Sequence, residues 1–423
     1  MRFGETILLV QKFNLNCSLR EGAPLHIIFL FFIIPFLVIV LLFVDFYFGR
    51  KKHLQNMHIY QFPIRHSNID IFINGTELFR QMVQDMKTAR HHIHVQFYIF
   101  RDDPFGSLVL ELMEKKVNEG IEVRLLIDWL GSLQFPRRRM KELRKKGIEI
   151  AFCHVPRFPF FLYTSQSRNH RKIIVIDGKI GFLGGFNIGK EYVNRDEVLN
   201  PWRDCHVRFT GEGVQDLQTQ FLTDWKKATN VKMKKSNYFP VLPKGDIKHR
   251  FYSFEGKDLE EKICELLRSA KRKIVIGTPY FIPGKKAFSE LKQSLKRCVD
   301  ITLIVPEISD HPFIKEASYR YLRQLLKLGC KVYQYRSGFY HAKVFIIDDD
   351  ICSIGTANFD KRSFYYNYEM NSIFYDRELV LRMLEIAEID LSKSTPLHFR
   401  KLERQKFHVV LKEWIAFVLS PLL

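Results

Sequence analysis

A polar motif that occurs twice in the chain is the strongest constraint on its fold. Residues 169–187 read NHRKIIVIDGKIGFLGGFN, and residues 340–360 read YHAKVFIIDDDICSIGTANFD. Five positions match, each pair 171 residues apart: His170 and His341, Lys172 and Lys343, Asp177 and Asp348, Gly184 and Gly355, Asn187 and Asn358. A lone histidine beside a strand is usually structural, but a coincidence would not keep five positions in register. The chain therefore contains an internal duplication.

The segments that precede each motif follow the same order. HHIHVQFYIF, GSLVLELMEKKVNEG and IEVRLLID predict a strand, an amphipathic helix and a buried strand; RKIVIGTPYFI, AFSELKQSLKRC and VDITLIVP predict the same in the second half. This alternation predicts an α/β fold of two homologous lobes, each a central mixed sheet flanked by helices. We expect the lobes at residues 60–230 and 250–400, joined by a polar, basic segment that contains prolines.

An apolar stretch near the N-terminus predicts a membrane anchor. Residues 27–44, IIFLFFIIPFLVIVLLFV, carry no charge and are numerous enough to span a bilayer as a helix. We expect an arm at 1–22 and a single transmembrane helix at 23–48, since no small-x-small site follows to favour the alternative, a cleaved signal peptide. The basic residues 50–52 predict that the large part of the chain after the anchor is cytoplasmic. The apolar C-terminal segment, 401–423, fits either an interfacial helix or a packing helix.

The bulk composition favours an anionic partner. The chain has 66 lysines and arginines against 46 acidic residues, a formal net charge of +20. Such a field suits either phospholipid head groups or nucleic acid. The seven cysteines are scattered and form no C-x-x-C, so neither a disulfide framework nor a zinc knuckle is indicated.

The motif residues suit the transfer of a phosphoryl group. On an extended strand, a histidine and a lysine two positions apart lie on one face, so two lobes related by a pseudo-twofold axis would bring both pairs to one site. One imidazole can then attack phosphorus while the other protonates the leaving alkoxide. The lysines, with the amides of Asn187 and Asn358, would stabilise the charge on the phosphoryl oxygens. Because two ammonium groups supply positive charge, we expect neither a metal nor another cofactor.

Four carboxylates accompany the motifs. Asp204 and Glu369 each open an expected strand after a motif, and we predict that they orient the histidines by accepting a hydrogen bond from the second ring nitrogen. A surface carboxylate at a strand edge is the alternative. Asp177 and Asp348 lie five residues beyond the lysines and are kept as motif members, although their position favours a structural function in the following turn.

At these residues the sequence resembles the phospholipase D superfamily, whose mark is two copies of H-x-K-x4-D-x6-G-x2-N, and within it the bacterial cardiolipin synthases. Further segments with that family's look are WRDCHVRFTGEGV, TPYFIPG and SDHPFIKEASYRYLRQLLKLGCKVYQY. The resemblance implies a bacterial cell-membrane enzyme with two phospholipase D-like lobes that transfers a phosphatidyl group between two phosphatidylglycerol molecules. It further implies His170 as the nucleophile and His341 as the general acid and base. One departure is that many such enzymes carry two N-terminal membrane helices.

Two rival functions share the motif. A phosphodiesterase that hydrolyses phospholipid or nucleic acid would use the same groups, but the anchor argues against nucleic acid, which we do not expect as a partner. A membrane scaffold with a dead site is disfavoured because both motifs are complete. The resemblance implies phosphatidylglycerol as the partner, and the anchor and the basic composition suit an anionic membrane surface.

Overall fold

The computed structural model describes residues 25–55, 57, 60–196, 198–233, 236–403, 405 and 407–419. The expected N-terminal arm, residues 1–22, lies outside them. The chain divides into two units, one of Met1–Gln55 with Arg157–Tyr163 and one of Asn56–Pro156 with Thr164–Leu423.

The first unit contains one long apolar helix, α2 (Leu25–Gln55). Its segment Phe32–Gln55 is long and apolar enough to cross a membrane: the mean hydropathy is 2.5, and 6% of the apolar window is buried. Apolar side chains from Phe32 to Val44 are largely exposed, as lipid-facing side chains are. The helix fits a transmembrane anchor, and it continues through the polar residues after 48, where the sequence analysis ended it.

The polar end of α2 contacts residues 157–163 of the same unit. The backbone N–H of Tyr163 donates to Asp45 Oδ1 at 2.8 Å, and the Tyr163 hydroxyl lies 2.6 Å from His53 Nδ1. Gly49 permits this approach, since a Cβ there would lie 2.6 Å from the Cβ of Tyr163. Residues 157–163 therefore stabilise α2 near the end of its apolar part.

The second unit holds two lobes with one strand order. In the first lobe the order is β5 (Glu149–Cys153), β4 (Glu122–Asp128), β3 (His92–Phe97), β6 (Ile173–Ile176), β7 (Ile180–Gly184), β8 (Trp202–Gly211), β2 (Arg65–Asn74). In the second it is β13 (Lys331–Tyr335), β12 (Asp300–Pro306), β10 (Lys273–Gly277), β15 (Val344–Ile347), β16 (Ile351–Gly355), β18 (Tyr368–Phe374), β9 (Ile247–Glu255). The first three strands of each lobe are parallel and the others antiparallel, which confirms two homologous lobes with mixed sheets.

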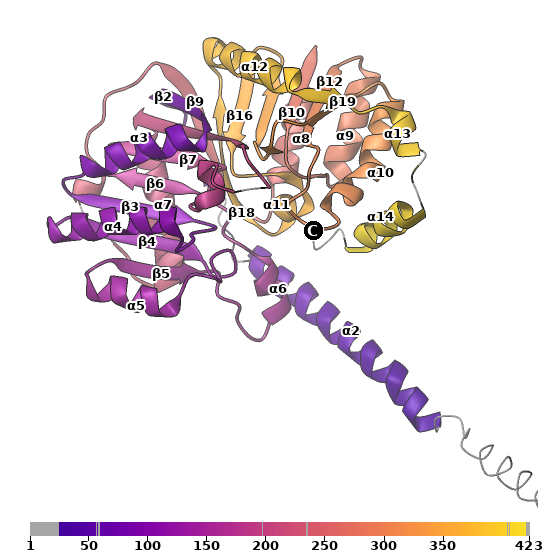
Figure 1. The fold of residues 1–423 in the computed structure, drawn as a ribbon, viewed down its shortest axis with the longest axis horizontal. Coiled ribbons are helices and arrows are strands. Elements are labelled where there is room, and N and C mark those ends of the chain that lie inside the picture. Colours follow the sequence, from indigo (N-terminus) through magenta and orange to yellow (C-terminus); the bar gives the residue numbers. More distant parts are fainter. Residues whose placement is uncertain are drawn as a thin grey trace, which may run out of the picture. The chain divides into compact units, whose positions relative to one another are not determined.

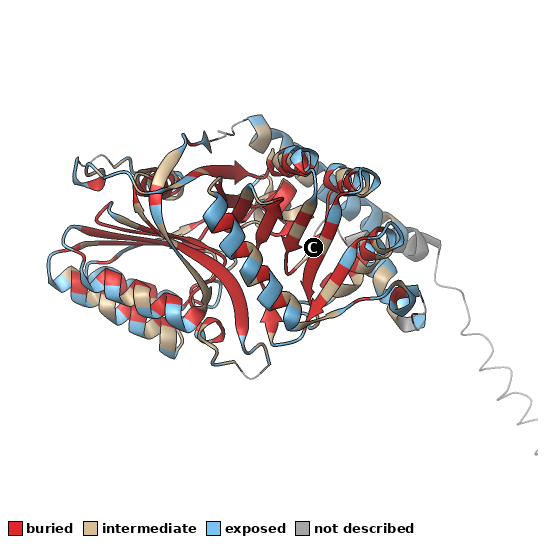
Figure 2. Cartoon of the chain, turned by 90° about the horizontal axis from the view of Figure 1, so that it is seen from above, coloured by how far each residue is buried: buried red, intermediate tan, exposed pale blue. Residues whose placement is uncertain are grey.

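Helices flank each sheet on both of its faces (Figure 1). They are α3 (Gly75–Lys87), α4 (Pro104–Asn118), α5 (Arg137–Lys145) and α7 (Val214–Thr229) in the first lobe, and α8 (Leu259–Ser269), α9 (Lys285–Lys296), α10 (Ile314–Lys327) and α12 (Arg377–Ser392) in the second. Figure 2 shows buried strands between helices that are buried on one side only. Caps fix where helices begin: Asn74 Oδ1 accepts from the N–H of Thr76 at 2.8 Å at the start of α3.

Smaller elements lie between and after these strands and helices in the chain. They are β1 (Tyr60–Gln61), α6 (Phe161–Gln166), η1 (Lys190–Val193), η2 (Ser236–Tyr238), β11 (Phe281–Ile282), β14 (Phe339–Tyr340), β17 (Phe359–Asp360), α11 (Lys361–Tyr365), β19 (Ser394–Pro396), α13 (Phe399–Glu403) and α14 (Phe407–Leu419). α14 buries Ala416 against α10 and leaves Phe407, Leu411 and Trp414 exposed.

The lobes meet through strands and a shared core. β2 pairs with β9, and β14 of the second lobe pairs in parallel with β8 of the first, with Phe339 opposite Trp202. One apolar cluster combines Ile173 and Val207 of the first lobe with Ala342 and Met370 of the second. Because this shared core holds the two sheets together, residues at the ends of β6 and β15 face each other across the lobe boundary.

Candidate active site

Each H-x-K segment lies immediately before a central strand. His170 and Lys172 precede β6, and His341 and Lys343 precede β15, rather than lying within a strand as the sequence analysis assumed. Each segment is instead hydrogen-bonded to the other lobe: the N–H of His170 donates to the carbonyl of Tyr368 at 2.9 Å, and that of His341 to the carbonyl of Arg203 at 2.7 Å. The two histidines are thereby fixed at the boundary between the lobes.

Asp204 and Glu369 contact the histidines, each across the lobe boundary. Nδ1 of His170 lies 3.0 Å from Glu369 Oε2 and 3.1 Å from Oε1. Nδ1 of His341 lies 2.6 Å from Asp204 Oδ2. The two carboxylates have no exposed surface. Each lobe therefore supplies the carboxylate for the histidine of the other, a pairing that sequence proximity to the motif does not reveal.

Burial sets the protonation states of these pairs. It lowers the pKa of His341 to about 4, with the charge of Lys343 acting in the same direction. It also lowers the pKa of His170 below its ordinary value, although Glu369 opposes the shift. Burial alone would raise the pKa of Asp204, but the nearby Lys343 and His341 outweigh it and hold that pKa low. Both imidazoles are thus neutral near pH 7, with Nδ1 bound to an anionic carboxylate and Nε2 left for chemistry.

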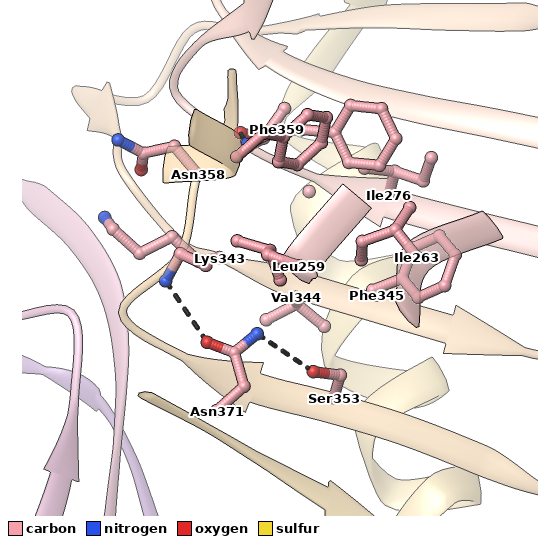
Figure 3. Close-up of a pocket in the computed structure, with 14 residues that line it drawn as sticks. Leu259, Ile263, Ile276, Lys343, Val344, Phe345, Ser353, Asn358, Phe359 and Asn371 are labelled. Carbon is pink, nitrogen blue, oxygen red and sulfur yellow. Dashed lines mark hydrogen bonds between the residues drawn. The ribbon is translucent and has the colours of Figure 1, made fainter. Parts of the chain in front are cut away.

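The two motif lysines are buried beside their histidines. Lys172 Nζ donates to the carbonyl of His170 at 2.7 Å, and Lys343 Nζ lies 3.3 Å from Asp204 Oδ2. Burial lowers the pKa of both ammonium groups. Figure 3 shows that the side chains of Lys343 and Asn358 extend away from the apolar cluster around Leu259, Ile263 and Phe345. Polar groups thus line the site while apolar groups support it.

Asn187 and Asn358 line the same cavity as the two histidines, which has a volume of about 410 Å³. Asn187 is held on both sides: its Oδ1 accepts from the N–H of Ile99 at 3.1 Å, and its Nδ2 donates to the Tyr192 hydroxyl at 3.1 Å. The Oδ1 of Asn358 is buried without a hydrogen-bond partner among the described residues. An unpartnered buried amide oxygen at the cavity wall can accept a hydrogen bond from a ligand.

Asp177 and Asp348 lie at the opposite ends of β6 and β15, and they do not line this cavity. The Asp177 carboxylate accepts from the backbone N–H groups of residues 90–92 at 2.7–2.9 Å. Asp348 does the same for residues 271–273 at 2.8–2.9 Å. Asp177 therefore fixes the loop that leads into β3, and Asp348 fixes the loop that leads into β10. The structure brings together the histidines, lysines and asparagines of the two motifs but not these two carboxylates.

The cavity contains further side chains that the sequence analysis did not select. Among them are Tyr98, Trp202, Tyr280, Asp310 and Arg362. Tyr98 follows β3, Tyr280 follows β10, and Asp310 follows β12. Sites in α/β folds often lie beyond the carboxyl ends of parallel strands, and this position is the signal that would have found them.

Known proteins share this fold and sequence. The family model described as "Cardiolipin synthase, PLD-like domain" matches residues 82–225 and 263–390. The chain is 36% identical over 393 residues to the minor cardiolipin synthase ClsB of Bacillus subtilis (strain 168), covering 92% of this chain and 98% of that protein. It is 37% identical over 370 residues to the cardiolipin synthase of Halalkalibacterium halodurans, covering 85% and 73%.

A solved structure shares the fold. Phosphatidylserine synthase of Haemophilus influenzae Rd KW20 superposes with a TM-score of 0.69 at 17% identity, covering 89% of this chain and all of that one. Because the identity is low, this likeness bears on the architecture alone. It places both lobes of this chain on an arrangement already observed in an experimental structure.

Proposed function

Because the chain belongs to the cardiolipin synthase family with phospholipase D-like domains, we propose that it transfers a phosphatidyl group from one phosphatidylglycerol to another, giving cardiolipin and glycerol. The family is shown by the matched lobes and by relatives at 35–37% identity over most of the chain. The protein is an enzyme of the phospholipase D superfamily that acts on phospholipids. The phosphatidylglycerol specificity and the function of each residue are the proposal.

The observation that carries the proposal is the pair of imidazoles in one cavity, each bound through Nδ1 to a buried carboxylate of the other lobe. Nε2 of His170 attacks phosphorus, and the phosphorus–oxygen bond to the head-group glycerol breaks. The anionic phosphodiester between the two histidines favours the charged form of His341, which takes up a proton as the substrate binds and gives it to the leaving glycerol oxygen. The product is a phosphatidyl group bound to His170.

The second half of the reaction reverses these steps with a new alcohol. The neutral His341 takes the proton from a head-group hydroxyl of a second phosphatidylglycerol, whose oxygen attacks phosphorus. The bond to His170 Nε2 breaks, and cardiolipin leaves. Lys172 and Lys343, with the amides of Asn187 and Asn358, stabilise the charge on the phosphoryl oxygens in both steps.

The anchor suits a substrate that is embedded in a membrane. We place the catalytic lobes on the cytoplasmic face of the bacterial cell membrane, because Arg50, Lys51 and Lys52 follow the apolar part of α2. A membrane-impermeant thiol reagent applied to intact cells should leave Cys298, which is exposed on the second lobe, unmodified, while it should label Cys298 after lysis. Labelling in intact cells would reverse the orientation.

The activity is tested with the purified full chain in mixed micelles of detergent and phosphatidylglycerol. We expect cardiolipin and glycerol in equal amounts, separated by thin-layer chromatography and identified by mass spectrometry. Phosphatidate without cardiolipin would identify a hydrolase instead. Cleavage of DNA in a parallel reaction, with no change in the lipid, would overturn the proposal.

A further inference from the structure

The two walls of the cavity differ although the two motifs are alike. The wall beside His170 carries Tyr98, whose ring lies 5.0 Å from the imidazole, and the cationic Arg362. The wall beside His341 carries Tyr280, at 6.1 Å between rings, and the carboxyl group of Asp310. Asp360 also lines the cavity, where the charge of Arg362 offsets its own, whereas no arginine lines the cavity beside Asp310 among the described residues. A phosphodiester substrate therefore meets different charges at its two ends.

Among the described residues, one carboxylate oxygen of Asp310 has polar partners and the other has none. Its Oδ2 accepts from the Tyr280 hydroxyl at 2.5 Å and lies 3.7 Å from His311 Nε2. Its Oδ1 is buried and has no hydrogen-bond partner within the described part of the chain. The side chain is 12% exposed and lines the cavity. Because a buried acceptor without a donor is unfavourable, the position favours a ligand that brings a donor.

The charge of Asp310 restricts which part of the substrate can lie there. A carboxylate repels phosphoryl oxygens and accepts hydrogen bonds from hydroxyl groups. The head group of phosphatidylglycerol carries two free hydroxyls, whereas its acyl chains carry none. The glycerol end of the substrate therefore fits the wall of Asp310 and His341, and the phosphate fits between the two histidines.

We propose that Asp310 forms a polyol subsite, accepting a hydrogen bond from the central hydroxyl of the head-group glycerol. The inference rests on the proposed function and adds the group that selects its alcohol. In the first half-reaction the central hydroxyl is adjacent to the oxygen that leaves; in the second it is adjacent to the hydroxyl that attacks. One subsite next to His341 thus binds both the leaving and the attacking glycerol. His341 therefore lies beside the oxygen that it protonates in the first half-reaction and deprotonates in the second.

The test compares head groups rather than total activity. The full chain and its Asp310→Ala variant, each in molar excess over the lipid, are given phosphatidylglycerol or phosphatidylpropanol, whose head group has the same three carbons but no hydroxyl. Release of the free alcohol is measured in micelles over a single turnover, which needs no acceptor alcohol because the phosphatidyl group stays on the enzyme. We expect the single-turnover rate constant for glycerol release from phosphatidylglycerol to fall by about 10- to 100-fold, the effect of losing a hydrogen bond to a charged acceptor. For phosphatidylpropanol we expect a change of less than about 3-fold. Asp310→Asn, which keeps an oxygen acceptor, should lie between the two.

A second carboxylate in the cavity provides the matched control. Asp360 also lines it, but its Oδ1 accepts from the N–H of Ser363 at the start of α11. Asp360→Asn should affect both lipids by the same factor. Equal losses for both lipids in Asp310→Ala, or no loss for either, would overturn the polyol subsite while leaving cardiolipin synthesis by the wild type intact. Failure of the wild type to release glycerol from phosphatidylglycerol would instead refute the proposed function.

Discussion

Replacing Glu369 by glutamine tests the function of the carboxylates most directly. Glu369 is fully buried and accepts from His170 Nδ1, the Ser363 hydroxyl at 2.9 Å and the Thr356 hydroxyl at 2.5 Å. Glutamine has the same length, and the Thr356 hydroxyl can accept as well as donate, so each contact has a possible counterpart. We therefore expect Glu369→Gln to fold with a thermal midpoint close to that of the wild type.

The expected loss of rate follows from the lost charge. During attack on phosphorus the His170 ring becomes positive, and a full charge about 4 Å away is worth about 4 kcal/mol at an effective dielectric constant of about 20. The exchange of a charged for a neutral hydrogen-bond acceptor sets a lower limit of about 1 kcal/mol. A value of about 3 kcal/mol corresponds to about a 150-fold fall in kcat.

The assay measures cardiolipin formed per minute by the purified full chain in phosphatidylglycerol micelles, at saturating lipid. Ser363→Ala is the control, because it removes one hydrogen bond to Glu369 and keeps the carboxylate; its rate should fall by less than about 10-fold. Asp204→Asn should slow turnover for the same reason as Glu369→Gln. Wild-type rates from both carboxylate variants would remove these residues from the mechanism, and loss of folded protein would show that their function is structural.

Four further predictions concern the same site. Gly185→Ser should abolish activity without unfolding the chain, because a Cβ there would lie 2.0 Å from Asp204 Oδ1; wild-type turnover would show that Asp204 can move away. Acid-quenched mass spectrometry should find a phosphatidyl group on His170 in the wild type, slowly in His341→Ala and never in His170→Ala, whereas an adduct on His341 would reverse their functions. The thermal midpoint should fall as the pH falls from about 6.5 towards 4, because burial lowers the folded-state pKa of His341 to about 4 while the unfolded chain takes up its proton near pH 6.5. The fall should be smaller in His341→Gln, and an identical pH dependence in that variant would contradict this. Activity in micelles should survive a chelator, since two lysines supply positive charge at the site; loss that only a divalent ion restores would contradict it.

The duplication made the architecture predictable. A constant spacing of 171 residues between matching positions, together with the repeated order of strands and helices, was sufficient to predict two lobes with mixed sheets. The structural function of Asp177 and Asp348 followed from their distance along the strand. They bind the loops before β3 and β10.

The cross-lobe pairing could not be predicted in the same way. Asp204 follows the first motif and Glu369 the second, so the sequence indicates which residues accompany each histidine but not which histidine each one contacts. That choice depends on how the two sheets meet, which is fixed by contacts such as the pairing of β14 with β8. Tyr280 and Asp310 lie in loops outside the repeated motif, within the segments TPYFIPG and SDHPFIKEASYRYLRQLLKLGCKVYQY. The resemblance of these segments to the family did not single out either residue.

One difference between the repeats bears on the division of labour between the histidines. Thr356 in the second copy donates its hydroxyl to Glu369, whereas the matching Gly185 leaves space for the Asp204 carboxylate. Glu369 thus accepts from neutral hydroxyls and from His170, and Lys172 interacts with its charge without a hydrogen bond to it among the described residues, while Asp204 lies 3.3 Å from the Lys343 ammonium. A carboxylate that no ammonium contacts directly stabilises the positive ring of a phosphohistidine better, which favours His170 as the nucleophile. The ammonium beside His341 makes its imidazolium a stronger acid, as a group that must protonate an alkoxide requires, and Asp310 on that side offers the acceptor for the departing alcohol.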